Sequence, residues 1–279
     1  MRVFKELLLK AAMIVSTLLT CGILAFMLGT ILIRGVPYIT PELLTSETSY
    51  LNDTIGILPN ICNTLYIIAV TMLIAVPLGV GAAVYITEYA DSKRIVRLIS
   101  FAAETLTGIP SILFGLVGML FFTQIMGIKQ GILAGGLTLV MMVLPTVISN
   151  TRESLLTVPN SYREGALALG SGKWHMIRTV VLPNALDGIL TGCILSVGRI
   201  MGESAALLFT AGFGLKLLSF TEALKSSSAT LTVALYVYAG EQGKFDVAFA
   251  IAVILMVLTL FLNLSAALIT KKLKTRRNG

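Results

Sequence analysis

The sequence predicts an all-α protein that lies in a lipid bilayer and crosses it with six transmembrane helices. Three observations support this: an apolar composition, six apolar runs of membrane-spanning length, and a concentration of Lys and Arg in alternate connecting segments. Hydrophobic residues make up 56% of the 279 residues and charged residues 13%, about half the ~25% of an ordinary soluble domain. Too few polar side chains remain to cover a soluble surface. Coiled-coil, collagen-like and disordered classes are excluded for the same reason.

Six apolar runs are long enough to cross a bilayer as helices. A bilayer core of ~30 Å requires ~20 helical residues, and backbone polar groups in lipid must be hydrogen-bonded within the protein. The third run contains Glu104, and the fifth contains Asp187 at its edge with Arg199 and Glu203 near its middle. The runs cover residues 11–33, 60–86, 98–128, 131–151, 184–212 and 247–270.

The first run could be mistaken for a secretion signal, because Arg2, Lys5 and Lys10 precede it. Its apolar stretch covers residues 11–33, which is longer than the ~7–15 residues of a signal core, and no small-x-small cleavage site follows. We therefore expect a retained helix.

The positive residues predict the orientation of the chain. With the N-terminus inside, the inner segments hold 15 Lys and Arg, whereas the outer segments hold 5. The inner segments are 1–10, 87–97, 152–183 and 271–279, and the outer ones are 34–59, 129–130 and 213–246. Because Lys and Arg concentrate in cytoplasmic loops, we expect both termini in the cytoplasm. The net charge of +7 is thus a topology signal, and no basic stripe with exposed aromatics indicates nucleic-acid binding.

Two runs contain residues that weaken helices. Pro77 is followed by Gly79 and Gly81, and Gly108 and Pro110 stand together in a second run. Proline removes a backbone hydrogen bond, so we expect these helices to kink or break. Two interpretations of the breaks remain open: close packing of helices, or backbone that lines a path through the membrane.

The cytoplasmic segment 151–183 is more structured than a simple connector. Ser161 followed by Glu164 has the spacing of a capping box, so we expect a short helix to begin there. Gly170 and Gly172 then have the positions of glycines that end a helix. The apolar residues Ala166, Leu167 and Leu169 lie between Glu164 and Gly170. An exposed apolar patch of this kind predicts a protein partner.

No catalytic or metal site is predicted. Gly170-Ser-Gly-Lys173 resembles part of a phosphate-binding loop, but the spacing G-x-x-x-x-G-K-[ST] is missing and Trp174 follows the lysine. We therefore do not expect this chain to hydrolyse ATP. The three cysteines lie far apart in apolar stretches and His175 is the single histidine, so no metal-ligand spacing exists.

The segment also resembles the EAA loop of ABC importer permeases. That loop reads Glu-Ala-Ala, three residues, Gly, nine residues and Ile-x-Leu-Pro. The matching positions here read Glu164-Gly165-Ala166, Gly170 and Val180-x-Leu182-Pro183. The resemblance implies the type I importer permease (MetI-like) fold, with residues 161–173 docking into a cytoplasmic ATPase. The implied contact residues are Arg163, Glu164, Gly165, Ala166, Leu167, Leu169, Gly170 and Lys173.

Further segments resemble phosphate importer permeases of the PstA type. These segments are 108–116, 158–159, 168–170, 173–174 and 199–211, within a similar region of about residues 60–212. Ser204 and Ala206 depart from the Thr and Pro of that family, and 213–246 matches weakly. The resemblance implies a bacterial inner-membrane subunit with four kinds of partner molecule. They are a PstC-like second permease, two PstB-like ATPase subunits that bind ATP and Mg²⁺, a PstS-like phosphate-binding protein outside the membrane, and the surrounding lipid.

The charged pair in the fifth run has two interpretations. Arg199 and Glu203 are four residues apart, so on one continuous helix they would share a face and could pair. The pair could be structural, or Arg199 could face a wet pathway and meet a passing oxyanion, because its planar fork suits phosphate oxygens. The family resemblance favours the second interpretation.

The expected organisation is an N-terminal helix and outer loop at 1–59, a permease core at 60–270 and a basic cytoplasmic tail at 271–279. Because ABC importers share the EAA loop, sulfate, molybdate or another substrate remains an alternative to phosphate. An ATP-independent secondary transporter is less favoured, since no internal repeat is evident.

Overall fold

The computed structural model describes residues 2–49 and 54–278, with the side chains of 5–49 and 54–268. Helices dominate this part of the chain, and the one departure toward β-structure within it is an isolated bridge between Ser49 and Thr54. The prediction of an all-α fold is confirmed.

Five helical stretches are long and apolar enough to cross a membrane. The first joins α1 (Arg2–Gly35) to η1 (Val36–Tyr38), and the second joins α3 (Leu58–Val84) to the π-helical turn η2 (Tyr85–Tyr89). The other three are α6 (Ile132–Thr157), the stretch from α8 (Lys173–Met176) through η4 (Ile177–Val181) to α9 (Leu182–Met201), and α13 (Phe245–Asn278).

The sixth predicted span, 98–128, is broken. Helix α4 (Lys93–Thr107) ends at Gly108, and α5 (Ser111–Gly118) with η3 (Met119–Ile125) continues at 104° to it. Pro110 stands immediately before α5, where its missing N–H costs no helical hydrogen bond. The expected break at Gly108 and Pro110 is confirmed. Six crossings result when the bent pair counts as one.

The predicted span 184–212 is also too long. Helix α9 ends at Met201, the chain is non-helical from Gly202 to Ser204, and α10 (Ala205–Thr210) is a separate short helix. Pro77, in contrast, does not interrupt α3, which runs continuously from Leu58 to Val84.

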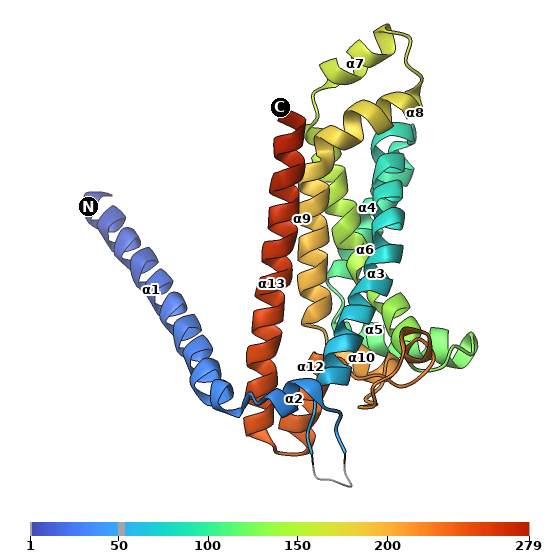
Figure 1. Cartoon of the computed structure of the whole chain (residues 1–279). Coiled ribbons are helices and arrows are strands. Elements are labelled where there is room, and N and C mark those ends of the chain that lie inside the picture. The colour runs from blue at the N-terminus through green and yellow to red at the C-terminus, as the bar shows by residue number, and fades with distance from the viewer. Residues whose placement is uncertain (1, 50–53, 279) are drawn as a thin grey trace.

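Helices α3, α6 and α9 form the centre of the body (Figure 1). Glycines allow them to approach closely: a side chain at Gly79 of α3 would collide with Val147 of α6, and one at Gly188 of α9 would collide with Ser154. Small residues at helix contacts are typical of membrane proteins, because they let backbones pack at short range.

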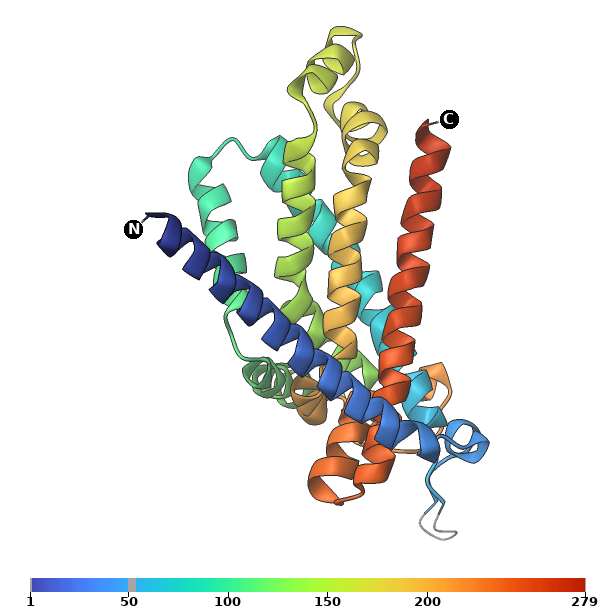
Figure 2. The ribbon, with the colours of Figure 1, turned by 90° about the vertical axis from the view of Figure 1, so that its left-hand side faces the viewer.

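Helix α1 diverges from this body (Figures 1 and 2). Its C-terminal end packs on α13, where Gly35 lies against the Phe249 backbone and the Arg34 guanidinium lies 5.5 Å from the Phe249 ring centroid. The most apolar stretch of α1 has none of its residues buried within the chain. Both termini lie toward the end of the molecule that carries α7 (Asn160–Ala168).

The opposite end is closed by short helices: α2 (Pro41–Thr45), α11 (Phe220–Ala223), α12 (Leu231–Tyr236) and η5 (Val237–Glu241). Buried polar groups fix the start of α12 to α3. The Nδ2 atoms of Asn60 and Asn63 both donate to the Ala229 carbonyl, and the Leu231 N–H donates to Thr64 Oγ1. The segment 213–246 is therefore part of the fold.

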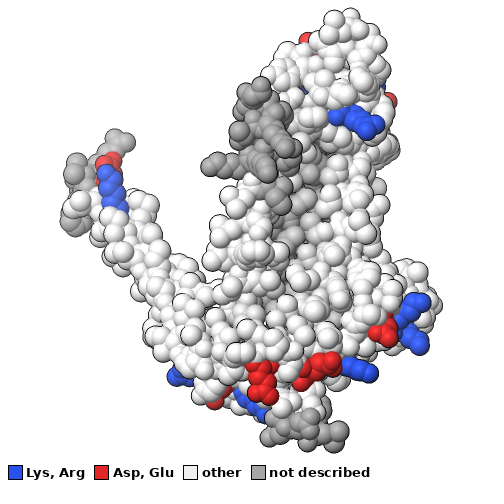
Figure 3. Space-filling model, viewed as in Figure 1, with Lys and Arg blue, Asp and Glu red and all other residues white. Residues whose placement is uncertain are grey.

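On the face shown in Figure 3, the charged side chains lie toward the two ends of the molecule, and the described surface between them is uncharged. This distribution is expected for a chain whose middle lies in hydrocarbon, because an isolated charge there costs several kcal/mol.

Candidate functional site

Helix α7 projects from the end of the molecule near both termini (Figure 1). It begins at Asn160, directly after Pro159, and no side chain among the described residues caps its first turn. The capping box expected at Ser161 and Glu164 is therefore wrong, because proline at the boundary already fixes the helical entry and places Ser161 inside the helix.

The turn after α7 depends on one glycine. Gly170 has φ of +81°, and its N–H donates to the Leu167 carbonyl while the Ser171 N–H donates to the Ala166 carbonyl. These two bonds form the Schellman motif that ends many helices, and glycine has no steric cost at positive φ. The expected role of Gly170 is confirmed. Gly172 instead precedes α8 as its N-cap residue.

The α7 segment exposes apolar surface at its tip. Leu167 is 49% exposed and Leu169 is 90% exposed, whereas Ala166 is half-buried against the body. Glu164 and Gly165 are exposed, and within the described part of the chain Glu164 makes no hydrogen bond or ion pair. Two leucines so open to solvent on a polar segment fit a surface that a protein partner covers.

Arg163 points inward, toward its own chain. Its guanidinium forms an ion pair with Glu88 of η2, with Nη2 2.8 Å and Nε 3.1 Å from Oε1. It also donates to the carbonyls of Val158 at 2.7 Å and Leu155 at 2.9 Å. The side chains of Arg163 and Glu88 are only 16% and 6% exposed. Arg163 therefore fixes α7 to η2 and satisfies carbonyls at the end of α6.

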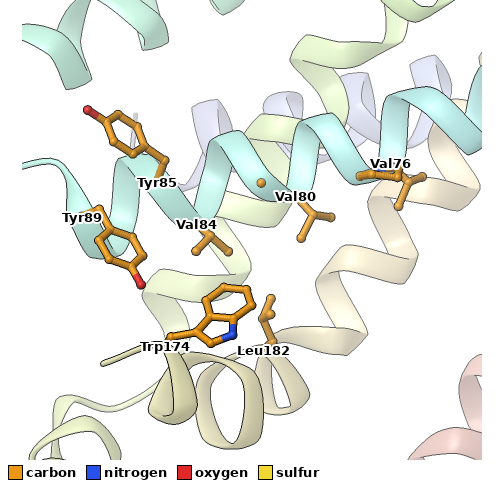
Figure 4. Close-up of a pocket in the computed structure, with 9 residues that line it drawn as sticks. Val76, Val80, Val84, Tyr85, Tyr89, Trp174 and Leu182 are labelled. Carbon is orange, nitrogen blue, oxygen red and sulfur yellow. The ribbon is translucent and has the colours of Figure 1, made fainter. Parts of the chain in front are cut away.

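Lys173 makes a second contact with the same turn. Its ammonium lies 4.9 Å from the ring centroid of Tyr89, the residue after Glu88, in a cation–π contact. Trp174, Tyr85 and Tyr89 border an apolar groove of about 580 Å³ between α3 and α8 (Figure 4). Glu88 and Tyr89 were not predicted, because they lie some seventy-five residues before Arg163 and only the tertiary structure brings them together.

The second candidate site, at the end of α9, differs from the prediction. Glu203 follows the last turn of α9, and its Oε1 accepts the Ala206 N–H at 3.0 Å at the start of α10. Its backbone carbonyl accepts the Thr232 hydroxyl at 2.8 Å. Glu203 is 9% exposed. Glu203 therefore stabilises the break between α9 and α10, and it does not pair with Arg199.

Arg199 makes no hydrogen bond or ion pair with any described residue. It lies in the last turn of α9 and is half-buried, one turn after Leu195, which is 55% exposed. An arginine in a membrane-spanning helix is costly without a partner, so its guanidinium needs a counter-charge, water or a second chain. All five of its N–H donors remain available to an anion.

The remaining predicted positions lie near the α4–α5 break. Gly108 and Pro110 are both exposed, and a side chain at Gly108 would meet only the Thr105 carbonyl, at 3.6 Å. The tight contacts come later, at Gly115 against Ala206 and Gly118 against Thr138. Glu104 is exposed on α4 and has no partner in the described residues.

Comparison with known proteins gives one family. Residues 75–275 match the family described as binding-protein-dependent transport system inner membrane component. The probable ABC transporter permease protein YqgI of Bacillus subtilis is 39% identical over 201 residues, which is 72% of this chain and 68% of that protein. The phosphate transport system permease protein PstA of Haemophilus influenzae is 36% identical over 217 residues, which is 77% of this chain and 75% of that protein.

Solved structures show the same fold at low sequence identity. A chain of the bacterial alginate ABC transporter, in complex with its alginate-bound periplasmic protein, superimposes with a TM-score of 0.68 at 15% identity, covering 94% of this chain and 93% of that one. A chain of the inward-facing MetNI methionine ABC transporter gives 0.59 at 20% identity, covering 78% and 94%.

Proposed function

The chain belongs to the family of binding-protein-dependent transport system inner membrane components, and from this membership we propose that it is a permease subunit of an ABC importer for inorganic phosphate. Phosphate is assigned as the substrate because the chain is similar to phosphate permeases. Relatives named PstA from Haemophilus influenzae and Pasteurella multocida are 36% and 31% identical over 77% and 87% of this chain.

The chain forms one part of the pathway and its partners supply the rest. A second permease subunit pairs with it in the membrane, two ATPase subunits bind ATP and Mg²⁺ in the cytoplasm, and a phosphate-binding protein delivers substrate outside. The exposed surface of Leu167 and Leu169 supports α7 as the place where an ATPase docks.

Arg199 supplies positive charge on the phosphate pathway. A phosphate anion in a region of low dielectric needs such charge, and the planar guanidinium fork matches its oxygens. The absence of an intrachain partner within the described residues leaves the guanidinium available. Glu203 shapes the pathway indirectly, by holding the start of α10.

The subunit lies in the bacterial inner membrane with both termini in the cytoplasm. The excess of Lys and Arg in the inner segments supports this orientation, as does the position of both termini at the α7 end (Figures 1 and 2). The segment 213–246 then faces the outside, where the binding protein docks.

Uptake of radiolabelled phosphate tests the proposal. The chain is expressed with its partner subunits in cells that lack their own phosphate permeases, and uptake is measured with and without a functional ATPase. We expect ATP-dependent phosphate uptake that excess sulfate or molybdate does not inhibit. Uptake of sulfate or molybdate in place of phosphate would assign a different substrate, and uptake without the ATPase would indicate a secondary transporter.

A further inference from the structure

Two contacts join the ATPase-facing segment to a single turn of another helix. Arg163 of α7 pairs with Glu88 at 2.8 Å, and the Lys173 ammonium lies 4.9 Å from the ring centroid of Tyr89. Glu88 and Tyr89 are the last two residues of η2, which continues α3 without a break. We call these two contacts the η2 clamp.

The clamp adds a noncovalent connection to the covalent path that leads from α7 to α9. After α7 the chain passes through Gly170 and Gly172 to α8 and on to α9, and both glycines have open space around them. Arg163, in contrast, holds Glu88 and two carbonyls at the end of α6 with a nearly buried guanidinium. Charge-assisted hydrogen bonds of this sort resist displacement in a weakly polar environment.

Helix α3 continues from the clamp to the far end of the molecule. It has 27 residues and no break at Pro77, so it is about 40 Å long at ~1.5 Å per residue. At its far end Asn60, Asn63 and Thr64 hold the outer segment at Ala229 and Leu231. One continuous helix therefore joins the coupling segment to the segment that contains Ala229 and Leu231.

We propose that Glu88, Arg163, Tyr89 and Lys173 are positioning residues that convey the movement of α7 to α3. This inference rests on the proposed function. It assigns the coupling to α3 through the clamp, in addition to the covalent connections of α7 to α6 and α9. Because coupling between sites is reciprocal, the same contacts convey the arrival of the binding protein to the ATPase.

The test uses the complete complex in proteoliposomes and measures the number of phosphate ions moved per ATP hydrolysed. We expect Glu88→Ala to lower this ratio about fivefold or more, the range of a typical coupling energy, while the ATPase subunits stay bound and ATP hydrolysis continues. Tyr89→Leu should lower the ratio too, whereas Tyr89→Phe should retain it because the ring is kept. Arg178→Ala is the control, since Arg178 is exposed on η4 and has no partner among the described residues.

A double-mutant cycle shows whether Glu88 and Arg163 act through each other or independently. If Glu88 acts through Arg163, then Glu88→Ala combined with Arg163→Ala should lower the ratio no further than Arg163→Ala alone. Unchanged ratios in the single variants, or losses that multiply in the double variant, would refute the inference. Loss of the ATPase subunits from the complex would assign the clamp to assembly and refute it as well. If the unsubstituted complex itself moves no phosphate, the proposed function fails, and binding-protein stimulation of ATP hydrolysis in the same variants then tests the clamp.

Discussion

Arg199 and Glu203 are four residues apart, but a break in the helix between them prevents the pairing that this spacing predicts. Four residues on a continuous helix would place the two side chains on one face, but the helix ends at Met201 and the carboxylate accepts the Ala206 N–H instead. An interaction between the two is therefore absent from the described structure. The guanidinium remains free for an anion, and the carboxylate has a structural role.

This arrangement predicts the behaviour of three variants. Arg199→Gln should lower phosphate uptake about tenfold or more, because a charge-assisted hydrogen bond contributes ~1.5–3 kcal/mol. Glu203→Gln should have a small effect, since an amide oxygen can still accept the Ala206 N–H. The double variant should behave like Arg199→Gln. The measurement is radiolabelled phosphate uptake normalised to assembled complex. Near-normal uptake in the double variant would support the interpretation of Arg199 and Glu203 as a structural pair.

Gly165 within α7 and Gly170 after it allow a matched comparison of glycine substitutions. Both have open space where a side chain would be added, but only Gly170 has a positive φ, of +81°. Gly170→Ala should strain the turn by ~1 kcal/mol or more and lower uptake, and Gly170→Asp should lower it further, with normal membrane insertion. Gly165→Ala should be tolerated, because alanine favours a helix. Equal uptake in all three variants would contradict the importance of this turn.

Among the helices, the predicted elements match the structure where a local feature of the sequence determines the element. Apolar length determined five of the spans, and the Gly108–Pro110 pattern located the 104° bend. The break after Met201 was missed because residues 184–212 read as one continuous run, and its stabilising contact comes from Thr232, far along the chain. The clamp was missed for the same reason, since no local pattern relates Glu88 to Arg163.

The contact between α3 and α6 offers a matched test of helix packing. A Cβ atom at Gly79 would lie 2.6 Å from Val147 Cγ1, whereas one at Gly81 would meet nothing within 4 Å. Gly79→Ala should therefore destabilise the protein by ~1–3 kcal/mol through overpacking. Gly81→Ala should be neutral or slightly stabilising. Thermal unfolding of the purified complex measures both, and equal melting temperatures would show that α3 and α6 separate easily.

For the whole molecule, labelling of cysteines in intact cells tests the orientation. After replacement of Cys21, Cys62 and Cys193, a cysteine at Thr45 should react with a membrane-impermeant reagent from outside. A cysteine at Leu169, on the α7 end, should react only after permeabilisation. Thr45 and Leu169 are both exposed, so access through the membrane is the difference measured. External labelling of Leu169→Cys alone would mean that the chain is inverted.

Among the residues whose side chains are described, helix α1 touches the body only near its C-terminal end and buries none of its most apolar stretch. A folded copy therefore presents most of α1 to lipid or to another chain. We expect the amount of this protein in a membrane to follow the synthesis of its partner permease more closely than its own. A copy made in excess would have lipid along α1 and would be the first to be degraded.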